Sequence, residues 1–130
     1  MKTLTPEGWT PARGYSHGIS CRGRTIYVAG QLGTDRAGKI VSENFGEQVK
    51  LALENVIAIL AADQAEPKHI VRMNWYFTSK DEYMAERKAI GAAWKALLGD
   101  HYPTITAVEV SGLLVPGGKI EIDCIAVVPD

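Results

Sequence analysis

The sequence predicts a single α+β domain, residues 1–130, in which two amphipathic helices pack on one face of one sheet. Three observations predict this class. Several short segments alternate apolar and polar residues with the period of two that is typical of strands. Two longer segments repeat their apolar residues at helical spacing. The predicted elements follow in the order β-β-α-β-α-β-β without an internal repeat, as in many α+β domains.

The N-terminal part of the chain predicts a hairpin. Residues 15–20 and 25–29 (TIYVA) are its expected strands, and residues 22–24 (RGR) form the turn between them. The GQLG sequence at residues 30–33 ends the second strand, because a glycine there either makes a turn or lets the backbone approach a neighbour closely. Residues 1–13 contain two prolines, so we expect an irregular or edge segment.

The two helices are predicted together with their caps. The first begins at Asn44, whose side chain can accept hydrogen bonds from the free amides of the first turn, with Glu47 three residues later. The second is expected over residues 80–98, and Gly99 follows it as a C-cap. The apolar residues at helical spacing are Phe45, Val49, Ala52, Val56 and Leu60 in the first helix and Tyr83, Ile90, Trp94 and Leu97 in the second.

Three further strands complete the predicted sheet, over residues 70–78, 104–111 and 119–128. We interpret Trp75 and Trp94 as core residues rather than as an aromatic cofactor site. Because both helices cover one face, the other face remains open. Such a mixed face is typical of a subunit interface or of a solvated surface. The polar residues expected on it are Arg72, Asn74, Glu109 and Glu121.

Composition argues against several classes of protein. The formal net charge is -1, without the basic surplus of a nucleic-acid binder. No apolar run has transmembrane length, and the first residues lack the apolar segment of a signal peptide, so we expect a cytoplasmic protein without membrane contact.

Cys21 and Cys124 lack zinc-site spacing. Both lie in strand-like runs, so we interpret them as buried hydrophobes, with a disulfide left open.

Six short strings match a known family in order over nearly the whole chain. They are GYSHGI (14–19), IYVAGQLG (26–33), EQVKLALENVIAIL (47–60), IVRMNWYFTSKDEY (70–83), YPTITAVEV (102–110) and KIEIDCIAV (119–127). On these strings the chain resembles the Rid (YjgF-like) family of reactive-intermediate deaminases, also called endoribonuclease L-PSP proteins. No single string is diagnostic, but the set in this order is specific.

The resemblance implies a fold, an assembly and an activity. The fold is chorismate-mutase-like. The assembly is a homotrimer whose sheets face inward, with three small-molecule clefts between the subunits. The activity is hydrolysis of reactive enamines and imines to 2-oxo acids and ammonia, with neither a metal nor an organic cofactor.

The resemblance also implies roles for individual residues. Glu121 matches the glutamate that holds the attacking water, and Tyr15 matches the pocket tyrosine. Gly30 and Gln31 match the strand end that lines the cleft. Ile105 stands where the family carries an arginine that binds the substrate carboxylate.

Ile105 leaves three hypotheses open. An isoleucine donates no hydrogen bond, and burying a carboxylate without a partner costs several kcal/mol. In the first hypothesis another cation, Arg13 or Arg87, supplies the charge. In the second, the substrate carries no carboxylate at that position. In the third, the protein no longer deaminates and only binds a ligand or serves a partner.

Other polar residues have structural interpretations. Glu121 could instead belong to an interface network, because perturbed ion pairs also occur without catalysis. We expect a structural role for Glu109 and local hydrogen bonds for His17 and His101. The helix asparagine that is frequent in the family is absent, since residues 86–89 read ERKA.

Overall fold

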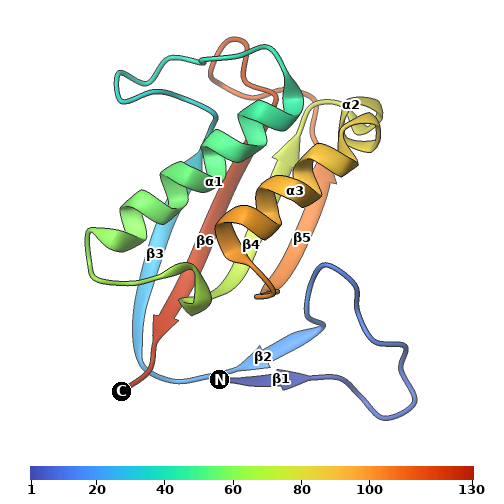
Figure 1. The fold of residues 1–130 in the computed structure, drawn as a ribbon, viewed down its shortest axis with the longest axis vertical. Helices are drawn as coiled ribbons and strands as arrows, with labels where there is room; N and C mark the ends of the chain where they lie inside the picture. Colours follow the sequence, from blue (N-terminus) through green and yellow to red (C-terminus); the bar gives the residue numbers. More distant parts are fainter.

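A four-stranded sheet with three helices on one face forms the body of the molecule, which a computed structural model describes over all 130 residues (Figure 1). The strands are β1 (Lys2–Leu4), β2 (Gly18–Ser20), β3 (Arg24–Gln31), β4 (Ile70–Phe77), β5 (Thr104–Glu109) and β6 (Ile120–Val128). The helices are α1 (Phe45–Ala61), α2 (Lys80–Ala85) and α3 (Arg87–Leu98), with a 3-10 turn at Pro67–His69. The predicted α+β class is confirmed.

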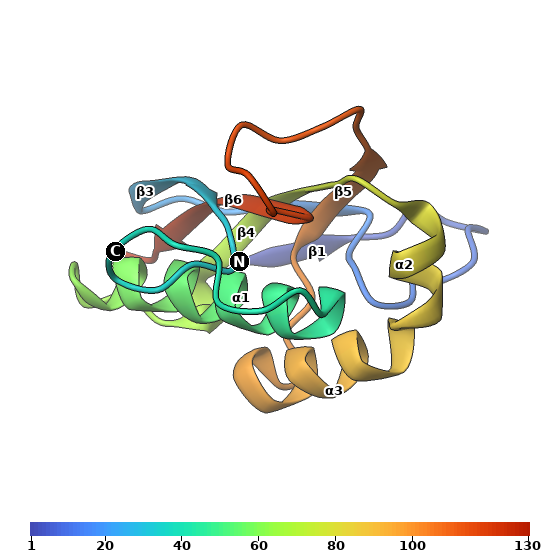
Figure 2. The ribbon, with the colours of Figure 1, turned by 90° about the horizontal axis from the view of Figure 1, so that it is seen from above.

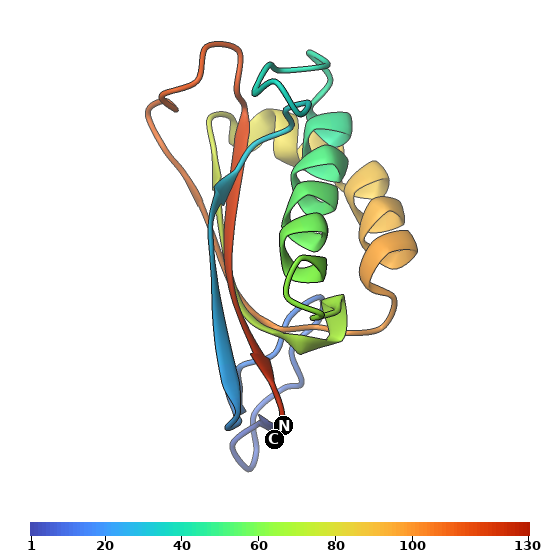
Figure 3. The ribbon, with the colours of Figure 1, turned by 90° about the vertical axis from the view of Figure 1, so that its left-hand side faces the viewer.

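The main sheet has the strand order β3-β6-β4-β5. β6 runs antiparallel to both of its neighbours, whereas β4 and β5 are parallel, because the chain crosses over through α2 and α3 between them. Seen from the side, all helices lie on one side of the sheet and the opposite face carries none (Figure 3). We call that opposite face the outer face.

The core lies between the sheet and α1. The apolar stripe of α1 is fully buried against β6 and β3, and α3 lies beside α1 in the same layer (Figure 2). Burying one such aliphatic side chain contributes about 1.5–3 kcal/mol. Trp75 and Trp94 are 3% and 8% exposed, which confirms their interpretation as core residues.

The predicted caps are confirmed, but the second helix is divided. Asn44 accepts a hydrogen bond from the Glu47 amide, and Gly99, at φ 63°, follows α3. The expected helix over residues 80–98 breaks at Glu86 into α2 and α3. The Glu86 carboxylate accepts a hydrogen bond from the Asn44 side chain. Because the local sequence favours a continuous helix, tertiary contacts of this kind override propensity.

The predicted N-terminal hairpin is wrong. β2 pairs with β1, whereas β3 pairs with β6 at the edge of the main sheet. Gly23 explains the difference, since a Cβ at this residue would lie 2.1 Å from the Val128 carbonyl oxygen. The chain therefore crosses tightly over the end of β6 and enters the main sheet there. β3 also continues to Gln31, past the predicted end at residue 29, through an irregularity between Val28 and Gln31.

The two cysteines have different surroundings. Cys124 is buried as predicted, but Cys21 is exposed in the turn after β2, so its interpretation as a buried hydrophobe is wrong. Both are free thiols.

No helix combines the length and the apolar character needed to cross a membrane.

Candidate functional site

The residues singled out from the sequence fall into two groups on opposite faces of the sheet. Glu121 lies on the outer face, because its neighbours Ile120 and Ile122 are fully buried under the helices. Gly30 lies against it. Four other residues line a cavity on the helix side, and neither Glu121 nor Gly30 lines that cavity. These four are Arg13, Tyr15, Arg87 and Ile105.

The Glu121 carboxylate packs against the backbone of Gly30. A Cβ on Gly30 would lie 2.6 Å from Glu121 Oε2 and 2.8 Å from its Cδ, so only glycine leaves room for this rotamer. Glu121 is half-buried and makes no hydrogen bond or ion pair within the chain. A carboxylate held in this way retains all its acceptor positions for a ligand or a water.

Two side chains, Gln31 of β3 and Asn55 of α1, hold the backbone at the end of β3 and just after it. Gln31, the last residue of β3, donates through its side chain to the Ala29 carbonyl. The Asn55 amide donates to the carbonyls of Leu32 and Thr34, at 3.0 Å each. The segment after Gly30 therefore has little freedom to move relative to α1.

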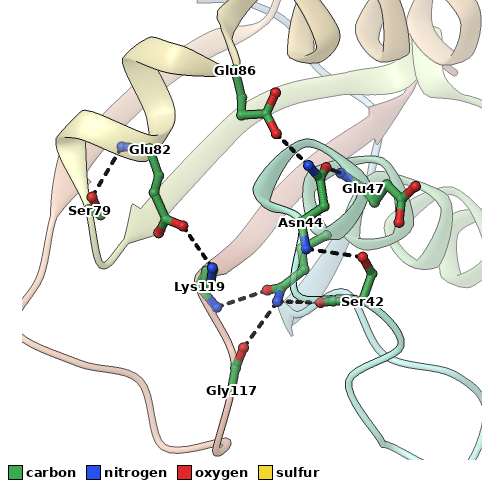
Figure 4. A network of polar contacts seen from close by, with 9 residues as sticks. Ser42, Asn44, Glu47, Ser79, Glu82, Glu86, Gly117 and Lys119 are labelled. Atoms are coloured by element: carbon green, nitrogen blue, oxygen red, sulfur yellow. Dashed lines mark hydrogen bonds and ion pairs between the residues drawn. The ribbon is translucent and has the colours of Figure 1, made fainter.

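Gln48, also on α1, connects this segment to the start of β6. Its side chain is fully buried. It donates to the carbonyls of Ser42 and Gly117 and accepts from the Lys119 amide at 2.9 Å. Figure 4 labels these three partners. Gly33 lies so close that a Cβ there would be 2.7 Å from the Gln48 Cα. Because the Lys119 amide is two residues before Glu121, these bonds fix the start of the strand that carries the carboxylate.

The same network reaches α2. The Lys119 ammonium group forms an ion pair of 2.7 Å with Glu82, and Ser79 caps the Glu82 amide (Figure 4). Glu109 caps the first amide of α2, that of Lys80, at 2.8 Å. Glu109 therefore has the structural role we expected, but its predicted position is wrong, because it lies on the helix side of the sheet.

The cavity on the helix side has a volume of about 590 Å³ and is bounded by α3, β5 and the loop before β2. Its walls are mainly aromatic and apolar. The aromatic and aliphatic residues of the lining include Tyr15, Trp75, Tyr83, Trp94, Tyr102 and Ile105. The rings of Trp94 and Tyr102 stack with an interplanar angle of 7°. Ile105 packs against the core cluster and forms part of the apolar wall.

Hydrogen bonds of Ser16 hold Tyr15 beside the residues that precede β5. The Ser16 amide donates to the Pro103 carbonyl at 3.0 Å, and the Ser16 hydroxyl donates to the Tyr102 carbonyl. His17 stacks edge-on against the Tyr15 ring and bonds the Thr10 carbonyl. The predicted local role of His17 is confirmed, as is that of His101, which bonds the Ile70 carbonyl at 2.7 Å.

The charged residues around the cavity are all cations. Arg13, Arg87 and Lys95 line it, no carboxylate does, and none of the three forms an ion pair within the chain. Burial raises the pKa of the Tyr83 hydroxyl, and the nearby Arg87 charge opposes that shift. Tyr83 therefore remains a neutral hydrogen-bond donor at neutral pH.

A separate polar cluster occupies the centre of the outer face. Arg72 donates to Asn74 and to Thr106, and Asn74 donates to Asp123 at 2.9 Å. The predicted placement of Arg72, Asn74 and Glu121 on this face is confirmed. Exposed apolar side chains surround the cluster, including Tyr27 at 76% and Val108 at 42% exposure.

The buried cysteine is not ionised at neutral pH, and the structure holds no clustered metal site. Burial, assisted by the Asp123 charge, raises the pKa of the Cys124 thiol to about 12, so the thiol stays protonated at neutral pH. No three His, Cys, Asp or Glu side chains lie together in an arrangement that could hold a metal ion.

Sequence reasoning missed two cavity residues on α3. Gly91 and Lys95 follow Arg87 at intervals of four residues, so all three lie on one face of the helix. The sequence shows that spacing, but it did not identify the residues as part of a cavity, because the predicted helix stripe contains apolar residues only.

The chain matches a known protein family and one of its relatives of known name. The model of the family described as "Endoribonuclease L-PSP" matches residues 6–128. A goat protein (Capra hircus) named 2-iminobutanoate/2-iminopropanoate deaminase is 32% identical over 105 residues, which is 80% of this chain and 73% of the goat protein.

Solved structures show the same architecture. YyfB of the conserved Rid protein family from Yersinia pestis has a TM-score of 0.84 and 28% identity, with 98% of each chain covered. TdcF from E. coli, solved with bound serine, has a TM-score of 0.68 and 28% identity, with 98% of this chain and 99% of TdcF covered. The YjgF-like fold is therefore shown.

Proposed function

The chain belongs to the endoribonuclease L-PSP, or Rid, family, and from this premise we propose that it hydrolyses an enamine or imine to a 2-oxo compound and ammonia. The name of the goat relative supports the reaction class. The observation within this chain that carries the proposal is the Glu121 carboxylate, seated against Gly30 and free of any partner.

The reaction needs few groups. A protonated imine carbon is electrophilic, so a water oxygen adds to it while Glu121 accepts one proton from that water. Glu121 then passes that proton to the nitrogen and accepts the proton of the new hydroxyl group as the C=O bond forms and the C–N bond breaks. The released ammonia takes up this proton and leaves as ammonium, so one water is consumed and the Glu121 carboxylate is restored, without a redox change. Tyr15 is the proposed hydrogen-bond partner of the nitrogen.

We propose that two subunits complete each site. Within one chain the sheet separates Glu121 from the cavity that holds Tyr15 and Ile105. A homotrimer with its outer faces inward would bring the Glu121 of one subunit to the cavity mouth of the next. The apolar side chains exposed on the outer face support burial of this kind, as does Leu114, fully exposed in the loop between β5 and β6.

Ammonia release tests the proposal. An amino-acid oxidase generates imines in place, and a coupled assay measures the acceleration of ammonia release by the protein. We expect acceleration by the wild type and a loss of about 10²–10⁴-fold in Glu121→Gln, with unchanged thermal stability, because Glu121 has no partner to lose. If no imine tested is hydrolysed faster with the protein, the alternative role of a non-catalytic metabolite-binding member replaces this one.

A further inference from the structure

The cavity is much larger than a three- or four-carbon imino acid requires. Its volume is about 590 Å³, and pockets of roughly 300–1,000 Å³ hold ligands of drug size. Tyr15 and Tyr102, at 40% and 38% exposure, present aromatic surface to water there, and a small acid would leave much of it uncovered. Filling that wall with apolar ligand surface contributes about 25 cal/mol for each Å² removed from water.

Gly91 keeps part of this space open. It lies in the interior of α3 on the cavity wall, and a Cβ there would meet no atom within 4 Å. Packing within the chain therefore does not require a glycine at this position. A glycine in a helix interior costs about 1 kcal/mol relative to alanine. This lost stability has a reason if a ligand occupies the space.

The charges around the cavity select the sign of the ligand. Arg13, Arg87 and Lys95 have no carboxylate partner in the chain, and no acidic residue lines the cavity. The Arg87 guanidinium is anchored at Nε to the Met84 carbonyl, which leaves its terminal nitrogens available. Ile105, in contrast, adds apolar surface where the charge would otherwise be expected.

We propose that the cavity binds an anion with a bulky apolar body, aromatic rings included. The body packs on Trp94, Tyr102 and Ile105, while the carboxylate meets Arg87 and Lys95 near the cavity mouth. In the proposed reaction, the protein would then hydrolyse imines of aromatic or large aliphatic amino acids. Only that last step rests on the proposed function; binding of the anion does not.

Calorimetric titration of the full chain tests the binding with three matched probes. These are 3-phenylpropionate, its neutral amide and propionate. We expect saturable binding of 3-phenylpropionate, at least tenfold weaker binding of the amide, and no saturation by propionate. Equal binding of acid and amide would overturn the anion site, and equal binding of propionate would overturn the apolar site.

Variants on α3 locate the ligand. Gly91→Leu fills the open space and should abolish binding, while Lys95→Gln should weaken it about fivefold by removing one exposed charge. Lys88→Gln is the matched control, because Lys88 is exposed on the same helix outside the cavity. Circular dichroism verifies folding of each variant. Unchanged binding in folded Gly91→Leu would overturn the proposal.

The binding and the reaction can fail separately. Binding of 3-phenylpropionate without ammonia release from any imine would contradict the proposed function and leave the cavity assignment standing. Rapid hydrolysis of 2-iminopropionate, without binding of 3-phenylpropionate, would do the reverse.

Discussion

The surroundings of Glu121 and the cavity around Ile105 are built in different ways. Glu121 is positioned by backbone: Gly30 beneath it, and strand ends that the Gln48 side chain fixes. The cavity is built from side chains on a helix, an edge strand and a loop, and its cations are unpaired. We therefore expect the backbone around Glu121 to support the proposed reaction. We expect the cavity side chains, which single substitutions can change, to determine which ligand binds.

The largest effect on stability should come from the buried side chain that supports the Glu121 region. Gln48→Leu removes three hydrogen bonds and leaves the Lys119 amide and the Gly117 carbonyl without partners. We expect a loss of about 3 kcal/mol in the free energy of unfolding, measured by urea denaturation. Lys50→Leu, exposed on the same helix, is the control. Equal stability of the two variants would show that the backbone there is held by other contacts.

Two glycines separate positioning from folding. Gly30→Ala displaces the flexible end of Glu121, so we expect about a 100-fold loss of activity with nearly unchanged stability. Gly33→Ala meets the backbone of Gln48 and should instead destabilise the fold by about 1–3 kcal/mol. Thermal melts and ammonia release measure both effects. Full activity in Gly30→Ala would mean that the Glu121 rotamer does not matter.

Ile105→Arg should change ligand choice on the cavity side. The new guanidinium offers bidentate bonds to a small carboxylate and removes apolar wall. We expect about tenfold faster hydrolysis of 2-iminopropionate and weaker binding of 3-phenylpropionate. If neither changes, the cavity differs from that of the family by more than this one side chain.

The smallest effect concerns the cysteines. At pH 7–8 a thiol reagent should label Cys21 in the native protein and leave Cys124 unlabelled until unfolding, with no loss of activity. Burial raises the Cys124 pKa from 9.0 to about 12 in the folded protein. Its burial therefore stabilises the fold below pH 9, and this contribution is lost progressively as the pH rises from 9 towards 12. Native labelling of Cys124 would contradict its burial.

The sequence predicted elements better than their partners. Period-two alternation identified β4, β5 and β6, and Asn44 marked the start of α1. The pairing of β2 with β1 was missed, because the close approach of Gly23 to Val128 joins residues about a hundred positions apart. The break at Glu86 was missed for a similar reason, since its bond to Asn44 is a tertiary contact.

The sequence identified candidate residues for the site, but it did not predict where the fold places them. The alternation of residues along the strands correctly placed Glu121 on the outer face, but it wrongly placed Glu109 there too. The faces of β5 and β6 cannot be related to one another without the register of their pairing with β4. Gly91 and Lys95 were not found at all. Their meaning depends on a cavity that α3 forms with a distant loop.

Mixing two inactive variants tests the central claim, that each site takes Glu121 from one subunit and the cavity from another. Glu121→Gln and Tyr15→Ala are each expected to lack activity. Unfolded together and refolded as a mixture, they should recover about one quarter of the wild-type ammonia release, because that share of the sites joins two intact halves. If the mixture stays as inactive as each variant alone, both halves belong to a single chain and the shared site is contradicted.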